Sequence, residues 1–376
     1  MNADASVAGL RVLGMEHFIA APYCTQLLAD QGADVIKVES GDASRAGYYY
    51  TLNRNKRSIV LDLKSTEGRT ALDALVRTAD VLVTNFAADV PERLGFGYER
   101  IAAINPRLVY VHITGFGQNS PYRRTAAFDG VIQAMSGLMD LTGEPDGPPM
   151  LAGMFVADHV AGVWATLAVT FGLLRRTQTG LGSYTDLSML DCLLAFHEST
   201  FMDVVQEGKT ATRIGSKVRN SFASTYQAKD GYVYIAPLTV RMWQAVAGVV
   251  GAPELLEFFS PADPLTDTRL EHRERCDAII EAWTRQHEVA EIVTLMQSVA
   301  VACSPILSIE ELIDDPHVKA RAMLRTVQDR QAGRAITVPG SPLPSMDSSF
   351  AVPPPGVGEH TAQILAELGL GRTGEH

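Results

Sequence analysis

The chain has 376 residues, of which 46% are hydrophobic and 20% are charged, and its formal net charge at pH 7 is −11. A chain of this length can bury a large core and can form two domains. The acidic balance argues against nucleic acid as a partner, because binding to phosphates requires an excess of Lys and Arg. The four cysteines are far apart and form no CxxC pair. We therefore expect reduced thiols, a cytoplasmic protein and no metal site.

No segment of the sequence is predicted to cross a membrane. The longest apolar run, 160–174, is interrupted by Gly162 and Gly172 and lies between Asp158 and Arg175. Such a run is too short, and too polar at its ends, to span a bilayer. The first residues lack the basic region and the small-residue cleavage site of a signal peptide. A membrane is therefore not expected as a partner.

The first part of the chain alternates predicted strands with predicted helices. Strands are expected at 10–15, 34–39, 58–62, 80–84 and 108–113, and helices at 22–31, 66–78 and 98–104. Strands separated by single helices indicate βαβ units and a parallel sheet. No GxGxxG motif follows the first strand, which disfavours a nicotinamide cofactor. The pattern predicts an α/β, Rossmann-like large domain.

The second part of the chain has a different pattern. Long helices are expected at 128–138, 158–176 and 186–206. A hairpin is expected at 226–236, because the Asp-Gly pair at its centre suits a tight turn. We predict a smaller α+β domain at 226–304, a linker at 206–225, and a discontinuous large domain formed by 1–205 and 305–376. The last part of that large domain is rich in Pro and is expected to be extended, ending in a helix at 358–368.

Asp158 is the most informative single residue, because it opens a long apolar helix in the segment GMFVADHVAG. The ordinary interpretation is a helix N-cap, since Asp is favoured there and its charge suits the helix dipole. The functional interpretation is a carboxylate nucleophile, which can attack a thioester while free helix N–H groups stabilise the oxyanion. Taken alone, this context favours the cap.

A series of fragments along the chain favours the functional interpretation instead. In order, the sequence carries AAPYCTQLLADQGADVIKVES, GDASR, NRNKRSIVLDLKS, ADVLVTNF, ERLGFGYERI, NPRLVYVHITGFGQNSPY, AFDGVIQAMSGLMDLTGEPDGPP, TGLGSYTDLSMLD, KDGYVYIAP and GEHTAQILAELGL. The series resembles the family III CoA-transferases, also called the CaiB/BaiF family, over nearly the whole chain. The resemblance implies an interlocked, ring-shaped homodimer, acyl-CoA and carboxylic acid substrates, and no cofactor besides the CoA of the substrate.

The resemblance also implies roles for individual residues. Asp158 stands where the family has its nucleophile, which forms an acyl anhydride and then an aspartyl-CoA thioester. The CoA contacts of the family fall on Arg45, Asn85 and Arg93, and a planar, permanently charged guanidinium suits phosphates. Asp129 stands where the family has an acidic residue close to the nucleophile. The ordinary alternatives are solvated surface arginines and, for Asp129, the N-cap of the helix starting near residue 128.

Two positions depart from the family pattern. Many members have a basic residue after the NF dipeptide, where this chain has Ala87, and some have a Lys where this chain has Ala126. Arg123 and Arg124 lie nearby and are expected to replace the Lys that is missing at Ala126.

Two other functions were weighed against CoA transfer. A racemase acting on α-methylacyl-CoA needs a His immediately before the Asp of the AFDG segment, and this chain has Phe128 there. Phe128 cannot accept a proton, so racemisation is disfavoured. A non-catalytic subunit of a hetero-oligomeric transferase is disfavoured because Asp158 is present.

Overall fold

The computed structural model describes residues 6–41, 47–218, 221–258, 268–329, 333–343 and 352–371, and Arg45 lies outside these residues. The described chain forms two compact units. The large unit comprises the described residues of Met1–Leu138, Leu151–Lys209 and Pro316–His376, and the small unit those of Met139–Met150 and Thr210–Asp315. The domain limits expected from the sequence, including the linker, stay a prediction.

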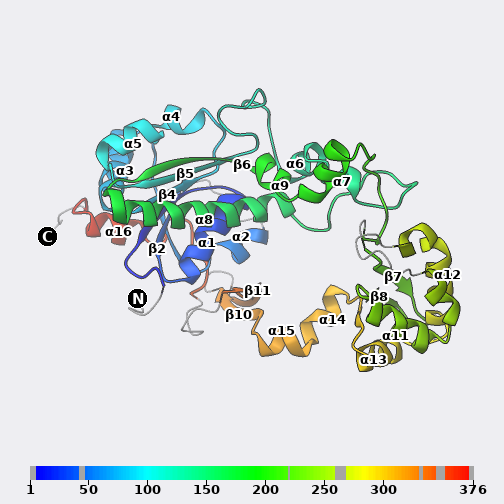
Figure 1. Cartoon of the computed structure of the whole chain (residues 1–376). Helices are drawn as coiled ribbons and strands as arrows, with labels where there is room; N and C mark the ends of the chain where they lie inside the picture. Colours follow the sequence, from blue (N-terminus) through cyan, green and yellow to red (C-terminus); the bar gives the residue numbers. More distant parts are fainter. Residues whose placement is uncertain are drawn as a thin grey trace. The chain divides into compact units, whose positions relative to one another are not determined.

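A parallel sheet forms the centre of the large unit (Figure 1). Its six described strands are β1 (Arg11–Met15), β2 (Asp34–Glu39), β3 (Lys56–Val60), β4 (Val81–Thr84), β5 (Val109–Thr114) and β6 (Ser183–Ser188). They are arranged in the order β3-β2-β1-β4-β5-β6, and each neighbouring pair is parallel. The order reverses between β1 and β4, and in open α/β sheets a crevice forms at the carboxyl ends of the strands at such a point.

Helices cover both faces of this sheet. The large unit contains α1 (Ala20–Asp30), α2 (Gly47–Leu52), α3 (Thr66–Thr78), α4 (Val90–Leu94), α5 (Tyr98–Ile104), α6 (Asp129–Met135), α8 (Val156–Thr179), α9 (Met189–Leu194), α10 (Glu198–Phe201), a π-helical turn (Met202–Gln206), α15 (Pro316–Ala320) and α16 (Thr361–Glu367). One core lies under α1 and α8, and a second lies under α3 and α5. Burial on both faces explains why the inner strands are nearly continuous apolar runs, as the sequence indicated.

The helix α8 is long and apolar enough, by length and composition, to cross a membrane. In the large unit its Ala157, Ala161, Ala165 and Val169 are fully buried. These side chains belong to the core shared with α1 and the sheet. The helix therefore serves as a covering helix of the sheet.

The structure corrects the prediction of one long helix at 186–206. The first residues of that range belong to β6, the sixth strand of the sheet, and α9 and α10 follow it. The strand sequence, SYTDLS, is polar because β6 is an edge strand with partly exposed side chains. Gly182 permits the close approach of this strand to β5, because a Cβ there would lie 2.0 Å from the carbonyl oxygen of Leu108.

The small unit has the α+β architecture that the sequence predicted. Its sheet contains β7 (Ser224–Gln227), β8 (Tyr232–Ala236) and β9 (Ala302–Pro305), antiparallel in that order. The predicted hairpin is confirmed as β7 and β8. The helices are α11 (Val240–Val250), α12 (Arg273–Thr284), α13 (Val289–Ser298) and α14 (Ile309–Asp314). Two 3₁₀ turns lie at Pro253–Phe258 and Thr268–His272. The short helix α7 (Leu138–Leu141) begins at the last residue of one segment of the large unit and continues into the small unit. Phe222, Trp243, Ile280 and Met296 form the centre of its core.

The late part of the chain returns to the large unit. The strands β10 (Leu324–Asp329) and β11 (Arg334–Pro339) form an antiparallel hairpin, which the sequence analysis did not predict. The segment 352–371 then covers the outer edge of β3. The Gly358 N–H donates to Ser58 Oγ (2.8 Å), the His360 N–H donates to the Ser58 carbonyl (2.9 Å), and Ile364 of α16 enters the core.

Candidate active site

A cavity of about 500 Å³ lies at the carboxyl ends of β1, β4 and β5. Of the described candidate residues, Asn85, Arg93, Arg123 and Asp158 line it, whereas Asp129 does not. The other walls include Phe18, Phe86, Ala87, Asp89, Arg124, Ala126 and Phe128. Each wall residue belongs to the large unit. The cavity is at the point where the strand order reverses, which is where open α/β sheets bind their ligands.

Asp158 is the third residue of α8 and not the N-cap, which is Phe155. The side chain of Phe155 cannot accept a hydrogen bond, so the first N–H groups of α8 need another partner. The Asp158 N–H donates to Asp129 Oδ1 at 3.1 Å. The carboxylate of Asp158 is therefore not used as a cap of its own helix, and it remains available to a substrate in the cavity.

Asp129 is the first residue of α6 and is also not an N-cap, because Phe128 holds that position. Its side chain is buried, and its second oxygen accepts a hydrogen bond from Gln133 Nε2 at 2.5 Å. Gln133 in turn accepts from the Ala152 N–H at 3.0 Å. This pair fixes the carboxylate that caps α8 and places its negative charge beside Asp158.

The surroundings of Asp158 alter its acidity. Burial, and then the negative charge of Asp129, raise its pKa from the ordinary 3.8 to about 7, although a hydrogen bond from the backbone of Ala20 opposes the shift. At neutral pH the ionised and protonated forms are both populated. A carboxylate of raised pKa is more basic, and hence a better nucleophile, than an ordinary Asp.

Small residues bring α1 close enough to α8 for that contact. Ala20 is the first residue of α1, and its N–H has no partner within that helix. Gly162 lies one turn after Asp158, and a Cβ there would be 2.9 Å from the Ala20 carbonyl oxygen and 2.9 Å from Tyr23 Cδ1. A glycine at this position therefore allows the N-terminus of α1 to reach the Asp158 carboxylate.

Two of the aromatic rings that line the cavity contact each other. Phe18 and Phe128 meet edge to face, with ring centroids 5.6 Å apart. Both rings are exposed, by 56% for Phe18 and 62% for Phe128. They give the cavity an apolar surface, and Phe128 offers no proton acceptor at the position where a racemase needs one.

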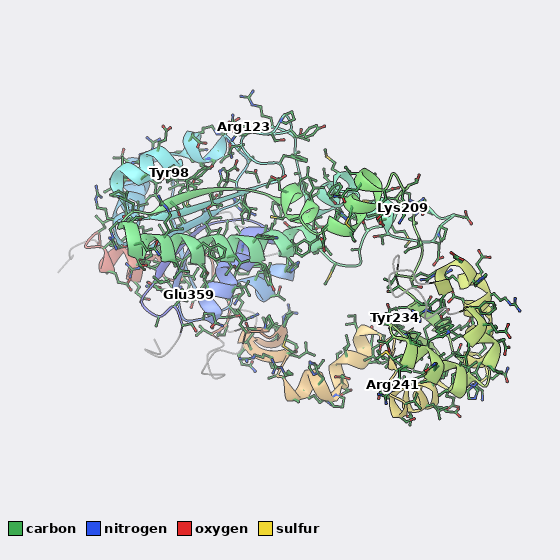
Figure 2. The ribbon with its side chains drawn as sticks, viewed as in Figure 1. Tyr98, Arg123, Lys209, Tyr234, Arg241 and Glu359 are labelled. Carbon is green, nitrogen blue, oxygen red and sulfur yellow. The ribbon has the colours of Figure 1, made fainter. Side chains whose placement is uncertain are left out.

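Three arginines give the cavity a positive side. Figure 2 shows Arg123 on the long loop that follows β5. Its guanidinium donates to Asp89 Oδ1 at 2.6 Å and to Gln118 Oε1 at 3.0 Å, and Arg124 lies 3.4 Å from the other oxygen of Asp89. Arg93 is exposed and has no hydrogen bond or ion pair to the side chain of another described residue. The three guanidinium groups outnumber the two carboxylates that line the cavity, Asp89 and Asp158, and leave excess positive charge for an anionic ligand.

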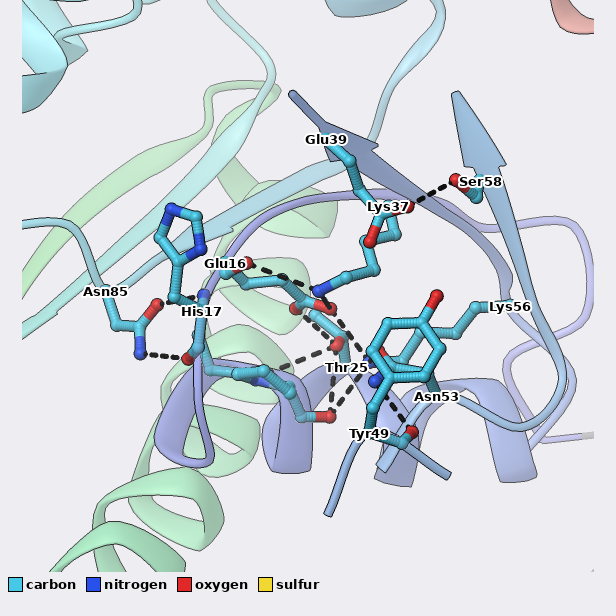
Figure 3. Close-up of polar contacts among 12 residues, drawn as sticks. Glu16, His17, Thr25, Lys37, Glu39, Tyr49, Asn53, Lys56, Ser58 and Asn85 are labelled. Carbon is cyan, nitrogen blue, oxygen red and sulfur yellow. Dashed lines mark hydrogen bonds and ion pairs between the residues drawn. The ribbon is translucent and has the colours of Figure 1, made fainter. Parts of the chain in front are cut away.

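Asn85 lines the cavity, but its amide is already engaged with the protein (Figure 3). Its Oδ1 accepts from the His17 N–H at 2.9 Å, and its Nδ2 donates to the His17 carbonyl at 2.7 Å. The sequence predicted a direct CoA contact for Asn85 and did not foresee this contact with the backbone of another loop.

A buried ionic cluster beneath the loop after β1 was also not foreseen. Glu16 accepts from Lys56 Nζ at 2.8 Å, from Lys37 Nζ at 3.3 Å and from Thr25 Oγ1 at 2.6 Å (Figure 3). Burial alone would raise the pKa of Glu16, but the two lysines lower it to about 2. Burial lowers the pKa of Lys56 to about 8. A Lys in the middle of a buried strand, as in DVIKVE, was the available signal, because such a charge needs a partner.

Comparisons with known proteins identify the family of the chain. The family model for CoA-transferase family III matches residues 7–361. The chain is 36% identical to the succinate–glutarate CoA-transferase of Agrobacterium fabrum, over 98% of this chain and 96% of that protein. It is 34% identical to the succinyl-CoA:mesaconate CoA-transferase of Haloarcula hispanica, over 96% of each chain. The solved structure of a CAIB/BAIF family protein from Brucella suis has a TM-score of 0.84 and 32% identity, covering 97% of this chain and all (100%) of that one.

Proposed function

Because this chain belongs to CoA-transferase family III, we propose that it moves CoA from an acyl-CoA to a carboxylic acid through covalent intermediates on Asp158. One observation carries the proposal. Asp158 presents a half-buried carboxylate of raised pKa to a cavity that also contains arginines. Transfer from an acyl-CoA requires two parts, which are a nucleophilic carboxylate and a group of cations that binds the phosphates of CoA.

The first half of the reaction loads the enzyme with CoA. An oxygen of Asp158 attacks the thioester carbonyl, the carbon–sulfur bond breaks, and the CoA thiolate leaves behind an acyl anhydride. The thiolate then attacks the Asp158 carbonyl of this anhydride. The donor acid leaves as a carboxylate, and an aspartyl-CoA thioester remains.

The second half reverses these steps with the acceptor. The incoming carboxylate attacks the Asp158 carbonyl and displaces the CoA thiolate. The acceptor and Asp158 are then joined as a second anhydride. The thiolate attacks the acceptor carbonyl, the new acyl-CoA is complete, and Asp158 is again a carboxylate. No step consumes a proton or an electron, so no further cofactor is required.

The cavity supplies two kinds of electrostatic assistance. The Ala20 N–H, at the N-terminus of α1, favours the ionised form of Asp158. A helix N-terminus also suits the negative charge that develops on the aspartyl carbonyl when the thiolate or the acceptor attacks. Arg93, Arg123 and Arg124 are proposed to bind the phosphates of CoA, together with Arg45, and Asn85 contributes to the wall of the same cavity.

Short dicarboxylic acids are the proposed substrates. The relatives at 36% and 34% identity are named for succinate and glutarate and for succinyl-CoA and mesaconate. We propose succinyl-CoA as the donor and a short dicarboxylic acid as the acceptor. A racemase function is not proposed, because Phe128 provides no base.

We propose that the active form is the interlocked homodimer of the family, located in the cytoplasm. The exposed face of α8 supports a homodimer. Trp164, Leu167, Phe171 and Leu174 lie along this face and are exposed. Contiguous apolar surface of this kind marks an interaction site in most proteins, and a second copy of the chain is the partner that the family suggests.

The covalent role of Asp158 has a direct test. Hydroxylamine should modify the wild-type enzyme only after acyl-CoA is added, because the anhydride and the thioester are far more electrophilic than a carboxylate. Peptide mass analysis should place the modification on Asp158. The Asp158→Asn variant should fold and bind CoA, and its transfer rate should fall by at least about 1,000-fold, the scale expected for loss of a nucleophile.

Asp73→Asn is a matched control for this substitution. Asp73 pairs with Arg100 at 2.8 Å on the surface of the large unit and lies outside the cavity. Its variant should keep full transfer and should still be modified at Asp158. Near wild-type transfer by Asp158→Asn, without reversion to Asp, would disprove the mechanism.

A further inference from the structure

The turn between β1 and α1 contains a strained residue beside the nucleophile. Phe18 has a φ of 55°, in the left-handed region. A residue with a Cβ is disfavoured there by about 1–3 kcal/mol, so neighbouring groups must hold the conformation. Strain of this kind is common at functional sites.

Two attachments hold the turn, one from each side. On the inner side, the carboxylate of Glu16 is fixed by Lys56, Lys37 and Thr25. On the cavity side, the amide of Asn85 bonds both the N–H and the carbonyl of His17, at 2.9 and 2.7 Å. The residue directly before Phe18 therefore cannot rotate its peptide groups without losing both bonds.

The turn leads directly into the donor that meets Asp158. Ala20 lies three residues after His17 and begins α1. Phe18 of the turn lines the same cavity as Asp158, and a Cβ at Gly162, one turn after Asp158, would lie 2.9 Å from the Ala20 carbonyl oxygen. The N-terminus of α1 therefore lies against the start of α8, and the Ala20 N–H lowers the pKa of the Asp158 carboxyl. Figure 3 shows the amide of Asn85 facing the backbone of His17, with both of its polar atoms in dashed contacts. This is the geometry of a clamp on the polypeptide backbone.

We propose that Asn85 is a positioning residue for Asp158: it clamps the His17 backbone, and the clamped turn holds the Ala20 N–H against the nucleophile. This role differs from the direct CoA contact that the family resemblance implied for Asn85. The inference rests on the proposed function of Asp158 as the reacting group.

Asn85→Ala should weaken the Ala20 contact and leave the CoA-binding arginines in place. Since the Ala20 hydrogen bond lowers the pKa of Asp158, the pKa seen in kcat/KM should rise by about 0.5–1 unit in the variant. We expect kcat to fall about 10-fold, and KM for succinyl-CoA to change by less than about twofold.

The other charges around Asp158 are unchanged by this substitution. Asp129 of α6 faces it directly, and the cavity loops contribute Asp89, Arg93, Arg123 and Arg124. A change in the pKa of Asp158 therefore reports the Ala20 contact and not the removal of a charge.

Asn105 provides the matched control. Its Nδ2 bonds the carbonyls of Val76 and Ala79 at 2.9 and 2.8 Å, so it is also an asparagine clamp on the backbone of the large unit. It does not line the cavity. Asn105→Ala should lower the melting temperature by about as much as Asn85→Ala does. It should leave kcat, KM and the pH profile of transfer unchanged.

A measurement without substrate separates this inference from the proposed function. The ¹³C NMR signal of the Asp158 carboxyl, assigned by its loss in Asp158→Asn, should titrate at higher pH in Asn85→Ala than in the wild type. If this shift occurs and the wild type transfers no CoA from any acyl-CoA tested, the positioning role stands and the proposed function fails.

Three results would overturn the inference. A rise in KM for succinyl-CoA of 10-fold or more, with an unchanged pH profile, would make Asn85 a CoA contact. An unchanged NMR titration would show that the clamp does not reach Asp158. If Asn85→Ala does not fold, Asn85→Ser takes its place, because a serine side chain is too short to bond both atoms of His17. Failure of both variants to fold would assign Asn85 a structural role only.

Discussion

The acidity of Asp158 links its surroundings to the chemistry proposed for it. The protonated form cannot attack a thioester, so the fraction of active enzyme depends on the pKa of this one group. Burial and Asp129 raise that pKa to about 7. The nucleophile is thereby made more basic, while part of the population is inactive at neutral pH.

This acidity predicts the pH dependence of transfer. The raised pKa means that ionisation is completed only above about pH 7. We expect kcat/KM to be constant above that pH and to fall about 10-fold per unit below it, when measured with succinyl-CoA and a dicarboxylic acceptor. Asp129→Asn removes the like charge and keeps an oxygen for the Asp158 N–H. Its profile should move to lower pH by about 1 unit, and a profile that does not move would exclude Asp129 as a cause.

The sequence identified individual site residues unevenly. The sequence predicted roles for Asp158, Arg93 and Arg123, and the structure brings these three residues together at one cavity. The interpretation of Asp158 and Asp129 as N-caps is wrong. The N-cap of α8 lies three residues before Asp158, and the N-cap of α6 lies one residue before Asp129. Sequence patterns locate helix ends only to within a few residues. The clamp of Asn85 on His17 joins residues 68 positions apart, and no local pattern encodes such a contact.

At the scale of elements, the contact of α1 with α8 controls the site. Both helices have their N-termini at the carboxyl edge of the sheet, as βαβ units require. Small side chains permit the close approach, with Ala157 and Ala161 buried and Gly162 next to Ala20. The nucleophile and its hydrogen-bond donor therefore come from two helices whose separation is set by a single glycine.

Gly162→Ala tests this dependence. The new Cβ would lie 2.9 Å from a backbone oxygen, so α1 must move away from α8. We expect a loss of about 1–3 kcal/mol in the free energy of unfolding, as in other overpacked cores, and a fall of kcat by about 10-fold or more. Urea unfolding and steady-state kinetics measure the two effects. Gly153→Ala is the control, because a Cβ there has no neighbour within 4 Å, and it should change neither quantity.

The elements were predictable where one physical pattern dominated. The range of α3 and the range of β2 were both predicted without error, because an amphipathic repeat and a buried apolar run are clear local signals. The strand β6 was missed because its residues are polar, and its place beside β5 is fixed by long-range pairing. The hairpin of β10 and β11 was not predicted, because its strands LRTVQD and RAITVP mix charged and apolar residues without a clear period.

At the scale of the whole molecule, the proposed assembly has its own test. Chains that thread through one another cannot separate without unfolding, so the mass measured by light scattering should remain that of a dimer on dilution to micromolar concentration. A monomer under these conditions would contradict the proposed assembly. Phe171→Ser, on the exposed face of α8, should weaken packing between copies and lower the melting temperature, whereas Ile309→Ser, which changes an exposed side chain of the small unit, should not.

The return of the segment 352–371 to β3 has a consequence for biosynthesis. Ser58 meets its partner Gly358 across 300 residues. At the usual rates of translation, roughly 15–60 s pass between the synthesis of these two residues. During that time the outer edge of β3 lacks its cover and the position of Ile364 in the core is vacant. An unpaired strand edge on a nascent chain invites pairing with other chains, so production of this protein should depend on chaperones that shield the ribosome-bound large unit until the segment emerges.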